Sequence, residues 1–179
     1  MKKVLFITLF LAVAAVLRAQ SVLGIDFGSS YETVKAALEE RYGKYEVSEV
    51  DGQLKIYGLT VGDFHFDIGT FTFQRNGSQS YFSSAEFQKH YSVTSTSGAK
   101  AERDYLYNTI KDKYADEYLE AFTNDQGFKC YKFGIDPKDE SKVLGNIQVF
   151  KGRSKGGQTY LYLIMEYGPI YYIDKASDF

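Results

Sequence analysis

Three ionisable side chains alternate along one predicted strand and form a first candidate site. Asp63, His65 and Asp67 are spaced two residues apart, so an extended strand places all three on one face. Two carboxylates and an imidazole are groups that can hold a divalent cation or orient a general base. Successive side chains on one strand face are about 6.5–7 Å apart, however, which is wide for one small ion. We favour the alternative, a solvent-facing strand surface, and predict no metal site.

Cys130 is the single cysteine of the chain, so no intramolecular disulfide can form. A catalytic thiolate would need a base, and the two histidines, His65 and His90, precede it by 40 residues or more. A single cysteine is more often a small buried apolar residue. The glycine-rich segment 151–157 lacks the ending of a phosphate-binding loop and favours a hairpin turn. We therefore expect no catalytic residue and no cofactor.

Aromatic residues are abundant, with 16 Tyr and 14 Phe but no Trp. In segment 158–167 both faces of a predicted strand are apolar or aromatic: one face holds Leu161, Leu163, Met165 and Tyr167, and the other holds Tyr160, Tyr162, Ile164 and Glu166. Segments 118–123 and 128–133 are two-sided in the same way. One helix can cover only one sheet face, so the other face presents its rings to solvent, packs on another part of the chain or meets a partner. Rigid rings with a polar tip are typical of interfaces. The binding residues that we predict are Tyr118, Tyr131, Phe133, Tyr160 and Tyr162.

The elements that would position these residues begin with a helix over about 30–42. Ser29 and Glu32 have the spacing of a capping box, and Gly43 can supply a left-handed stop. The hydrophobic period then changes to two. Hairpin signals at 51–52 and 76–77 separate predicted strands over 45–50, 54–57, 64–73 and 80–87.

A second helix and a second series of strands follow the polar segment 92–98. Apolar residues from Ala99 to Tyr114 have helical spacing, with Arg103 as the exception in the stripe. Predicted strands cover 118–123, 128–133, 143–151 and 158–167, and residues 170–173 are expected to add a short edge piece.

The order of helix, four strands, helix, four strands predicts an α+β fold of two tandem repeats. Each repeat would be one helix followed by a four-stranded antiparallel sheet, over residues 20–91 and 92–179. The segment 54–57 also parallels 128–131 in its residue types. We interpret this as a duplication; chance similarity is the alternative.

The first 19 residues have the pattern of an export signal. Lys2 and Lys3 precede an uncharged run over 4–17, too short for a membrane span, which needs about 20 residues. We expect cleavage after Ala19; a short buried helix is the alternative. No cysteine lies at the junction to carry a lipid, and no second long apolar run follows. These features predict a periplasmic or secreted protein with no lipid anchor and no membrane span.

The charge balance excludes some partners. The whole chain has a formal charge of −2. Removing Lys2, Lys3 and Arg18 with the signal leaves 18 basic and 23 acidic residues, or −5. Nucleic-acid binders usually carry a basic excess, and an acidic protein is repelled by phosphates and anionic lipids. We expect neither as a partner.

The run Gly28-Ser29-Ser30-Tyr31-Glu32-x-Val34, the stop at Gly43 and the strands after it resemble bacterial envelope modules. These include the small outer-membrane assembly lipoprotein family and the beta-lactamase-inhibitor-protein family. The second is nearer in layout because it repeats its module in tandem. The resemblance implies protein binding without catalysis. The anchoring cysteine of the first family and the disulfides of the second have no counterpart here, and no binding residue is transferred.

Together these observations predict a secreted or periplasmic, non-catalytic protein-binding module of the bacterial cell envelope that uses an aromatic sheet face. The alternative is a protein that binds a small molecule or glycan between the two repeats. An enzyme ranks third.

Overall fold

The computed structural model describes residues 21–112, 118–134, 143–154 and 156–169. The expected signal over 1–19 and the edge piece at 170–173 lie outside these ranges. A two-stranded ribbon opens the described chain, with β1 (Ser21–Val22) and β2 (Ile25–Asp26). The helix α2 (Tyr31–Tyr42) leads into the strands β3 (Val47–Val50), β4 (Gln53–Val61), β5 (Phe64–Asn76) and β6 (Gln79–Ser92). The helix α3 (Thr96–Lys111) precedes β7 (Leu119–Thr123), β8 (Lys129–Gly134), β9 (Val143–Arg153) and β10 (Thr159–Tyr167).

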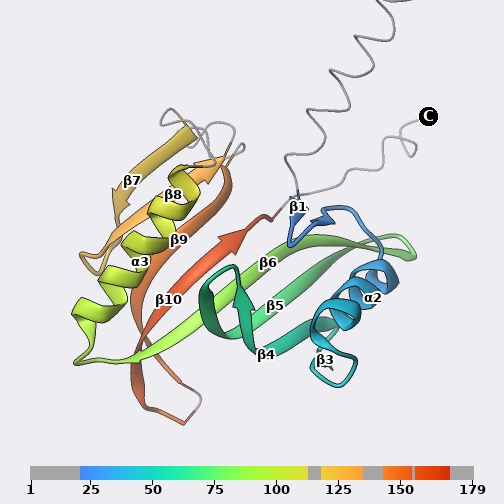
Figure 1. Ribbon diagram of the computed structural model, residues 1–179, viewed down its shortest axis with the longest axis horizontal. Helices are drawn as coiled ribbons and strands as arrows, with labels where there is room; N and C mark the ends of the chain where they lie inside the picture. The colour runs from blue at the N-terminus through green and yellow to red at the C-terminus, as the bar shows by residue number, and fades with distance from the viewer. Residues whose placement is uncertain (1–20, 113–117, 135–142, 155, 170–179) are drawn as a thin grey trace, which may run out of the picture.

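The strands from β3 to β10 form one antiparallel sheet of eight strands in the order β3-β4-β5-β6-β10-β9-β8-β7 (Figure 1). The expected fold of two helix-plus-four-strand repeats is therefore wrong, and an internal repeat is not supported. About 56% of the described residues are strand, against two helices, so the protein is mostly β. The physical reason lies at β6 and β10, which pair over eight positions from Ala85 to Ser92. Two separate sheets would each leave an unpaired edge there, and direct pairing satisfies both edges.

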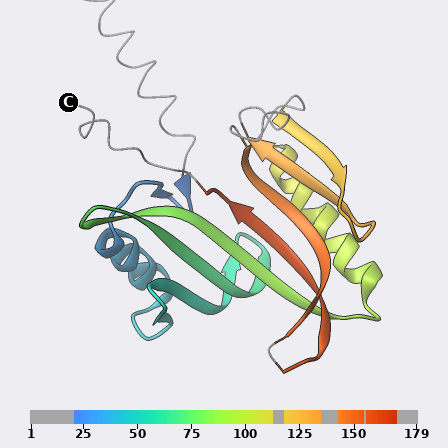
Figure 2. The same cartoon turned by 180° about the vertical axis from the view of Figure 1, so that it is seen from behind.

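Both helices pack on one face of this sheet, which we call the helix face. Figure 1 is viewed from the helix side, and Figure 2 shows the sheet from behind. Val34 and Leu38 of α2 and Leu106 and Ile110 of α3 are buried in a single core that runs along the sheet. Because one core serves both helices, the described parts of the segments 20–91 and 92–179 share their packing. Among the described helices, none combines the length and apolar character needed to cross a bilayer.

The first helix begins one residue later than the capping box suggested. The Ser30 side chain, not that of Ser29, accepts a hydrogen bond from the Thr33 backbone N–H at 3.2 Å. The Ser29 backbone is used elsewhere, because its carbonyl accepts from the Phe82 N–H at 2.8 Å. Gly43 ends the helix with φ of 101°, as predicted. The apolar stripe of the second helix is also confirmed from Ala99 to Ile110, with Arg103 buried in it, and Tyr114 lies outside the described residues.

The strands expected between residues 45 and 167 all exist, but several are longer than predicted, and β4 and β5 change phase along their length. Leu54 and Ile56 face the core, and so does Leu59 three residues later. Gly58, with φ of 67°, lies at the change, and the facing β5 shifts in step. Gly69 is buried and Ile68 is half-buried, the reverse of the simple alternation. A residue in left-handed conformation lets a strand turn its side chains over without breaking its pairing.

Candidate binding surface

The sheet face opposite the helices, which we call the open face, presents an ordered array of side chains from β6, β10 and β9. Strand β10 alternates buried and half-buried residues along its length. Its half-buried members pair in register with residues on both neighbouring strands. The resulting rows are Ser92, Tyr160 and Gly152; His90, Tyr162 and Phe150; Gln88, Ile164 and Gln148; and Glu86, Glu166 and Asn146.

One end of the array is an aromatic cluster of His90, Phe150, Tyr160 and Tyr162. The Phe150 and Tyr162 rings stack, with centroids 5.3 Å apart and an interplanar angle of 13°. His90 meets the edge of Tyr162 at 4.9 Å, and Tyr160 meets Tyr162 edge-on at 6.4 Å. Tyr162 thus touches each of the other three rings. All four side chains keep part of their surface exposed.

Gly152 makes room for the centre of this cluster. A Cβ at Gly152 would lie 2.8 Å from Cε2 of Tyr162 and 3.2 Å from Phe150. The Tyr162 ring therefore lies across the glycine of the neighbouring strand. This packing restrains the ring, and a restrained ring loses little conformational entropy when it binds.

The other end of the array is polar. Asn146 donates to Glu166 Oε2 at 3.0 Å, and Gln148 donates to Asn146 Oδ1 at 2.8 Å. Gln88 donates to Glu86. Burial raises the pKa of Glu166, the nearby Glu86 charge raises it further, and the Asn146 hydrogen bond opposes both effects. Glu86 and Glu166 are directly opposite in register and form what we call the carboxylate pair.

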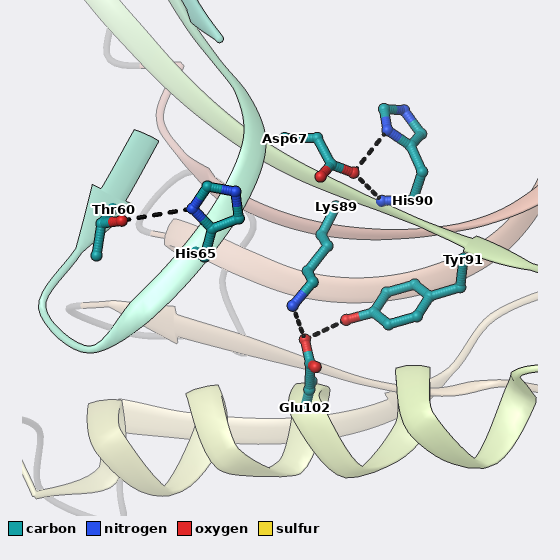
Figure 3. Close-up of polar contacts among 7 residues, drawn as sticks. All are labelled: Thr60, His65, Asp67, Lys89, His90, Tyr91 and Glu102. Atoms are coloured by element: carbon teal, nitrogen blue, oxygen red, sulfur yellow. Dashed lines mark hydrogen bonds and ion pairs between the residues drawn. The ribbon is translucent and has the colours of Figure 1, made fainter. Parts of the chain in front are cut away.

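Figure 3 shows how β6 sends alternate side chains to the two faces. Lys89 and Tyr91 point to Glu102 of α3, with a Lys89 Nζ to Glu102 Oε2 distance of 2.7 Å. His90, between them, points the other way and pairs with Asp67, which accepts from the His90 backbone N–H at 2.7 Å and contacts Nδ1 at 2.9 Å. The Asp67 carboxylate thus binds the backbone near the C-terminal end of β6 and orients the His90 ring.

The five predicted binding residues divide between the two faces. Tyr160 and Tyr162 lie in the aromatic cluster on the open face. Tyr131 and Phe133 are 4% and 0% exposed in the core, so they are not available to a partner. Tyr131 stacks on Tyr107 of α3 at 3.9 Å and donates to Asp104 at 2.9 Å. Tyr118 is 38% exposed just before the edge strand β7, away from the cluster.

Of the alternating acids and histidine, Asp63 lies in the turn before β5, and the two members on that strand have separate partners. Asp67 is engaged by His90, and His65 contacts the Thr60 hydroxyl through Nδ1 at 3.4 Å. Within the described ranges, no group of three or more His, Cys, Asp or Glu side chains is arranged to hold an ion.

Cys130 is fully buried and free. Burial raises the pKa of its thiol, which disfavours the reactive thiolate form. At this position the cysteine acts as a small apolar side chain of the core.

Sequence reasoning placed Glu166 on one strand face with Tyr160 and Tyr162, but it missed His90, Phe150 and Glu86 as neighbours on the same surface. The period-two pattern gives the face of each residue within its own strand, but it does not say which strands are neighbours. Only the pairing of β6 with β10 brings residues 86–92 beside residues 160–166.

An open hollow of about 390 Å³ lies elsewhere, at the start of α2. It is lined by Gly28, Ser30, Tyr31, Glu32 and residues 78–81. Comparisons of the chain with protein-family models, with curated proteins and with solved structures found no match.

Proposed function

We propose that this chain is an exported, non-catalytic binding protein that engages a protein partner through its open face. The observation that carries the proposal is the aromatic cluster, which stands half-exposed on the sheet face opposite the helices. Tyrosine and other large rings dominate the energetics of protein interfaces because they bury much area at a low entropy cost. Export is supported by Lys2, Lys3 and the uncharged run over 4–17. The likeness of the run from Gly28 to Val34, with its stop at Gly43, to bacterial envelope modules that bind proteins also favours a protein partner.

A protein partner fits the surface better than a ligand held between two repeats. The array is built on three adjacent strands of one continuous sheet, and the hollow at α2 lies apart from it. A surface of this kind can be covered by a second protein. A sugar ring stacked on Tyr160 or Tyr162 is the competing occupant, and it would bind without a protein partner.

The test is a matched pair of double variants in the full mature chain. Tyr160→Ala with Tyr162→Ala removes two rings of the cluster, whereas Tyr45→Ala with Tyr105→Ala removes two exposed tyrosines from outside it. Proteins captured from the native envelope are identified, purified and titrated against each variant by calorimetry. We expect the first pair to weaken binding at least 100-fold, the scale of two interface anchors, and the second pair to leave it unchanged.

Two results would count against the proposal. Equal binding by both double variants would place the interface elsewhere. A thermal shift on a glycan panel that disappears with the open-face pair, with no purified protein bound, would favour the sugar.

A further inference from the structure

We propose that the open face takes a basic segment of its protein partner, with an arginine or lysine side chain held by the carboxylate pair while neighbouring apolar side chains pack on the aromatic cluster. This inference rests on the proposed function above and adds the chemistry of the partner. Its first support is the position of the carboxylate pair. Glu86 and Glu166 are directly opposite on neighbouring strands and share the open face. Cβ atoms of such pairs are about 4.5–5.5 Å apart, which brings both carboxylates within reach of one cation.

The carboxylate pair is unfavourable for the isolated protein. Like charges directly opposite in a sheet destabilise it, and both side chains are half-buried. The hydrogen-bond donors that the structure gives them, Gln88 and Asn146, are neutral amides. The ion pairs shown in the described part of the chain, such as Lys35 with Glu49 and Lys89 with Glu102, lie elsewhere. The row of paired residues that contains the carboxylate pair continues from Glu166 through Asn146 to Lys132, so this lysine lies on the second strand away from Glu166.

A guanidinium group matches this arrangement. Its planar fork can hydrogen-bond two carboxylate oxygens at once, and its aliphatic stem can lie along apolar surface. Ile164 supplies that surface, because it is the next open-face residue after Glu166 on β10. A partner cation that balances both carboxylates gains more binding free energy here than it would at a pair that a basic side chain of the same protein already neutralises.

The spacing along β10 also defines the size of the segment. Glu166 and Tyr160 are six residues apart on one strand face, or about 20 Å at the usual rise. A partner segment of about six extended residues covers this length. One basic residue at the acidic end and apolar residues toward the tyrosines would match the array.

Charge favours this occupant over the others. The mature chain carries 18 basic and 23 acidic residues, and an acidic protein attracts basic partners over distance. A second copy carries the same excess of acidic residues, so long-range electrostatic repulsion disfavours it as the occupant. A lone divalent cation would find only two carboxylates, and the described residues offer no third acid, histidine or cysteine to complete its shell.

The experiment uses immobilised hexapeptides of apolar and aromatic residues with one arginine, beside the same hexapeptides with neutral citrulline in its place. The full mature chain is titrated over both sets at low, physiological and high salt. We expect at least tenfold tighter binding to the arginine set and a loss of this preference at high salt. The Glu86→Gln with Glu166→Gln variant should bind both sets equally, because glutamine keeps the shape and removes the charges. The matched control is Glu40→Gln with Glu46→Gln, two exposed acids outside the open face, which should keep the preference.

The outcomes separate this inference from the proposed function. Equal binding of both peptide sets by the native protein, or no binding to either, overturns the basic-segment inference. A thermal shift with calcium or magnesium that requires Glu86 and Glu166 also overturns it and makes the pair a metal site. If Tyr160→Ala with Tyr162→Ala still abolishes capture of the envelope partner in these cases, the proposed function stands. If that variant captures the partner normally, the proposed function fails. Melting curves of each variant verify that the fold is intact.

Discussion

Glu166 is a residue whose charge opposes the fold. Its pKa is raised by burial first and by Glu86 second. An acid with a higher pKa in the folded state binds more protons there than in the unfolded chain. Its contribution to stability is therefore complete below the unfolded value of about 4.3 and is lost as the pH rises through the folded value. We expect Glu166→Gln to increase the free energy of unfolding at pH 7 by up to about 1 kcal/mol, the scale of a cross-strand charge contact.

The measurement is urea unfolding of the native protein and Glu166→Gln at pH 7 and below about pH 4, where the gain should disappear because the native carboxyl is protonated. Glu40→Gln, at an exposed helix position, serves as the control and should change stability by less than about 0.5 kcal/mol at both pH values. A lower stability of Glu166→Gln at pH 7 would mean that the folded protein stabilises this charge.

Two tyrosines show what the sequence alone cannot predict about a single residue, namely whether its sheet face is covered by a helix. Tyr131 and Tyr162 have similar settings in the sequence, each on a strand with bulky residues on both faces. Tyr131 lies under α3 and stacks on Tyr107, whereas Tyr162 lies on the open face against Phe150. Alternation separates the two faces of a strand correctly. It cannot say which face a helix distant in sequence will cover.

The first turn of α2 tests the cap that the structure assigns. Ser30 accepts from the Thr33 N–H and its hydroxyl also meets the Thr33 hydroxyl at 2.9 Å. We expect Ser30→Ala to cost about 1 kcal/mol, the usual value of a lost N-cap. Ser29→Ala should cost less, because the cap is the Ser30 hydroxyl and the contacts that the structure gives Ser29 are made by its backbone. Chemical unfolding of both variants measures the difference, and a larger loss for Ser29→Ala would support the capping box.

Arg103 anchors α3 to the sheet. It is 4% exposed, and its Nη1 donates to the Lys129 carbonyl at 2.8 Å while Nε and Nη2 donate to Asp104. We expect Arg103→Lys to cost about 2 kcal/mol, because an ammonium cannot make the fork and leaves a buried acceptor poorly satisfied. Lys100→Met, at an exposed site on the same helix, is the control and should cost less than about 0.5 kcal/mol. Urea unfolding that gives the two variants equal stability would contradict this anchoring role.

At the scale of elements the sequence is informative about type and less so about extent. Helical spacing located both helices, including the position of Arg103 within the apolar stripe. Strands β5 and β6 run to 13 and 14 residues, longer than their alternating segments. Pairing with long neighbours extends a strand beyond its own pattern, and the phase change at Gly58 hides the pattern further.

The overall fold depends on one strand pairing that cannot be predicted from the sequence pattern. Two runs of four strands can form two sheets or one, because each run satisfies the same local rules. The eight-residue pairing of β6 with β10 selects one sheet and one core. It also creates the open face, since residues of both runs meet only across this seam. The candidate surface could therefore not be assembled from the sequence, although Tyr160 and Tyr162 were named by it.

Because the seam joins both halves of the sheet, the protein should unfold as one unit. Leu163 is fully buried on β10 and pairs with Lys89 of β6 and Val149 of β9. We expect Leu163→Ala to cost about 2–5 kcal/mol, as large-to-small core changes do. Hydrogen exchange of the full chain should then speed up together for amides of β4 and β5 on one side and of β8 and β9 on the other, because small domains open cooperatively. Val50→Ala, on the edge strand β3 and 37% exposed, should speed exchange only in its own hairpin.

If Leu163→Ala left the amides of β4 and β5 fully protected while those of β8 and β9 exchanged, the halves would be independent folding units. The seam would then be an interface between them and no longer the centre of one core.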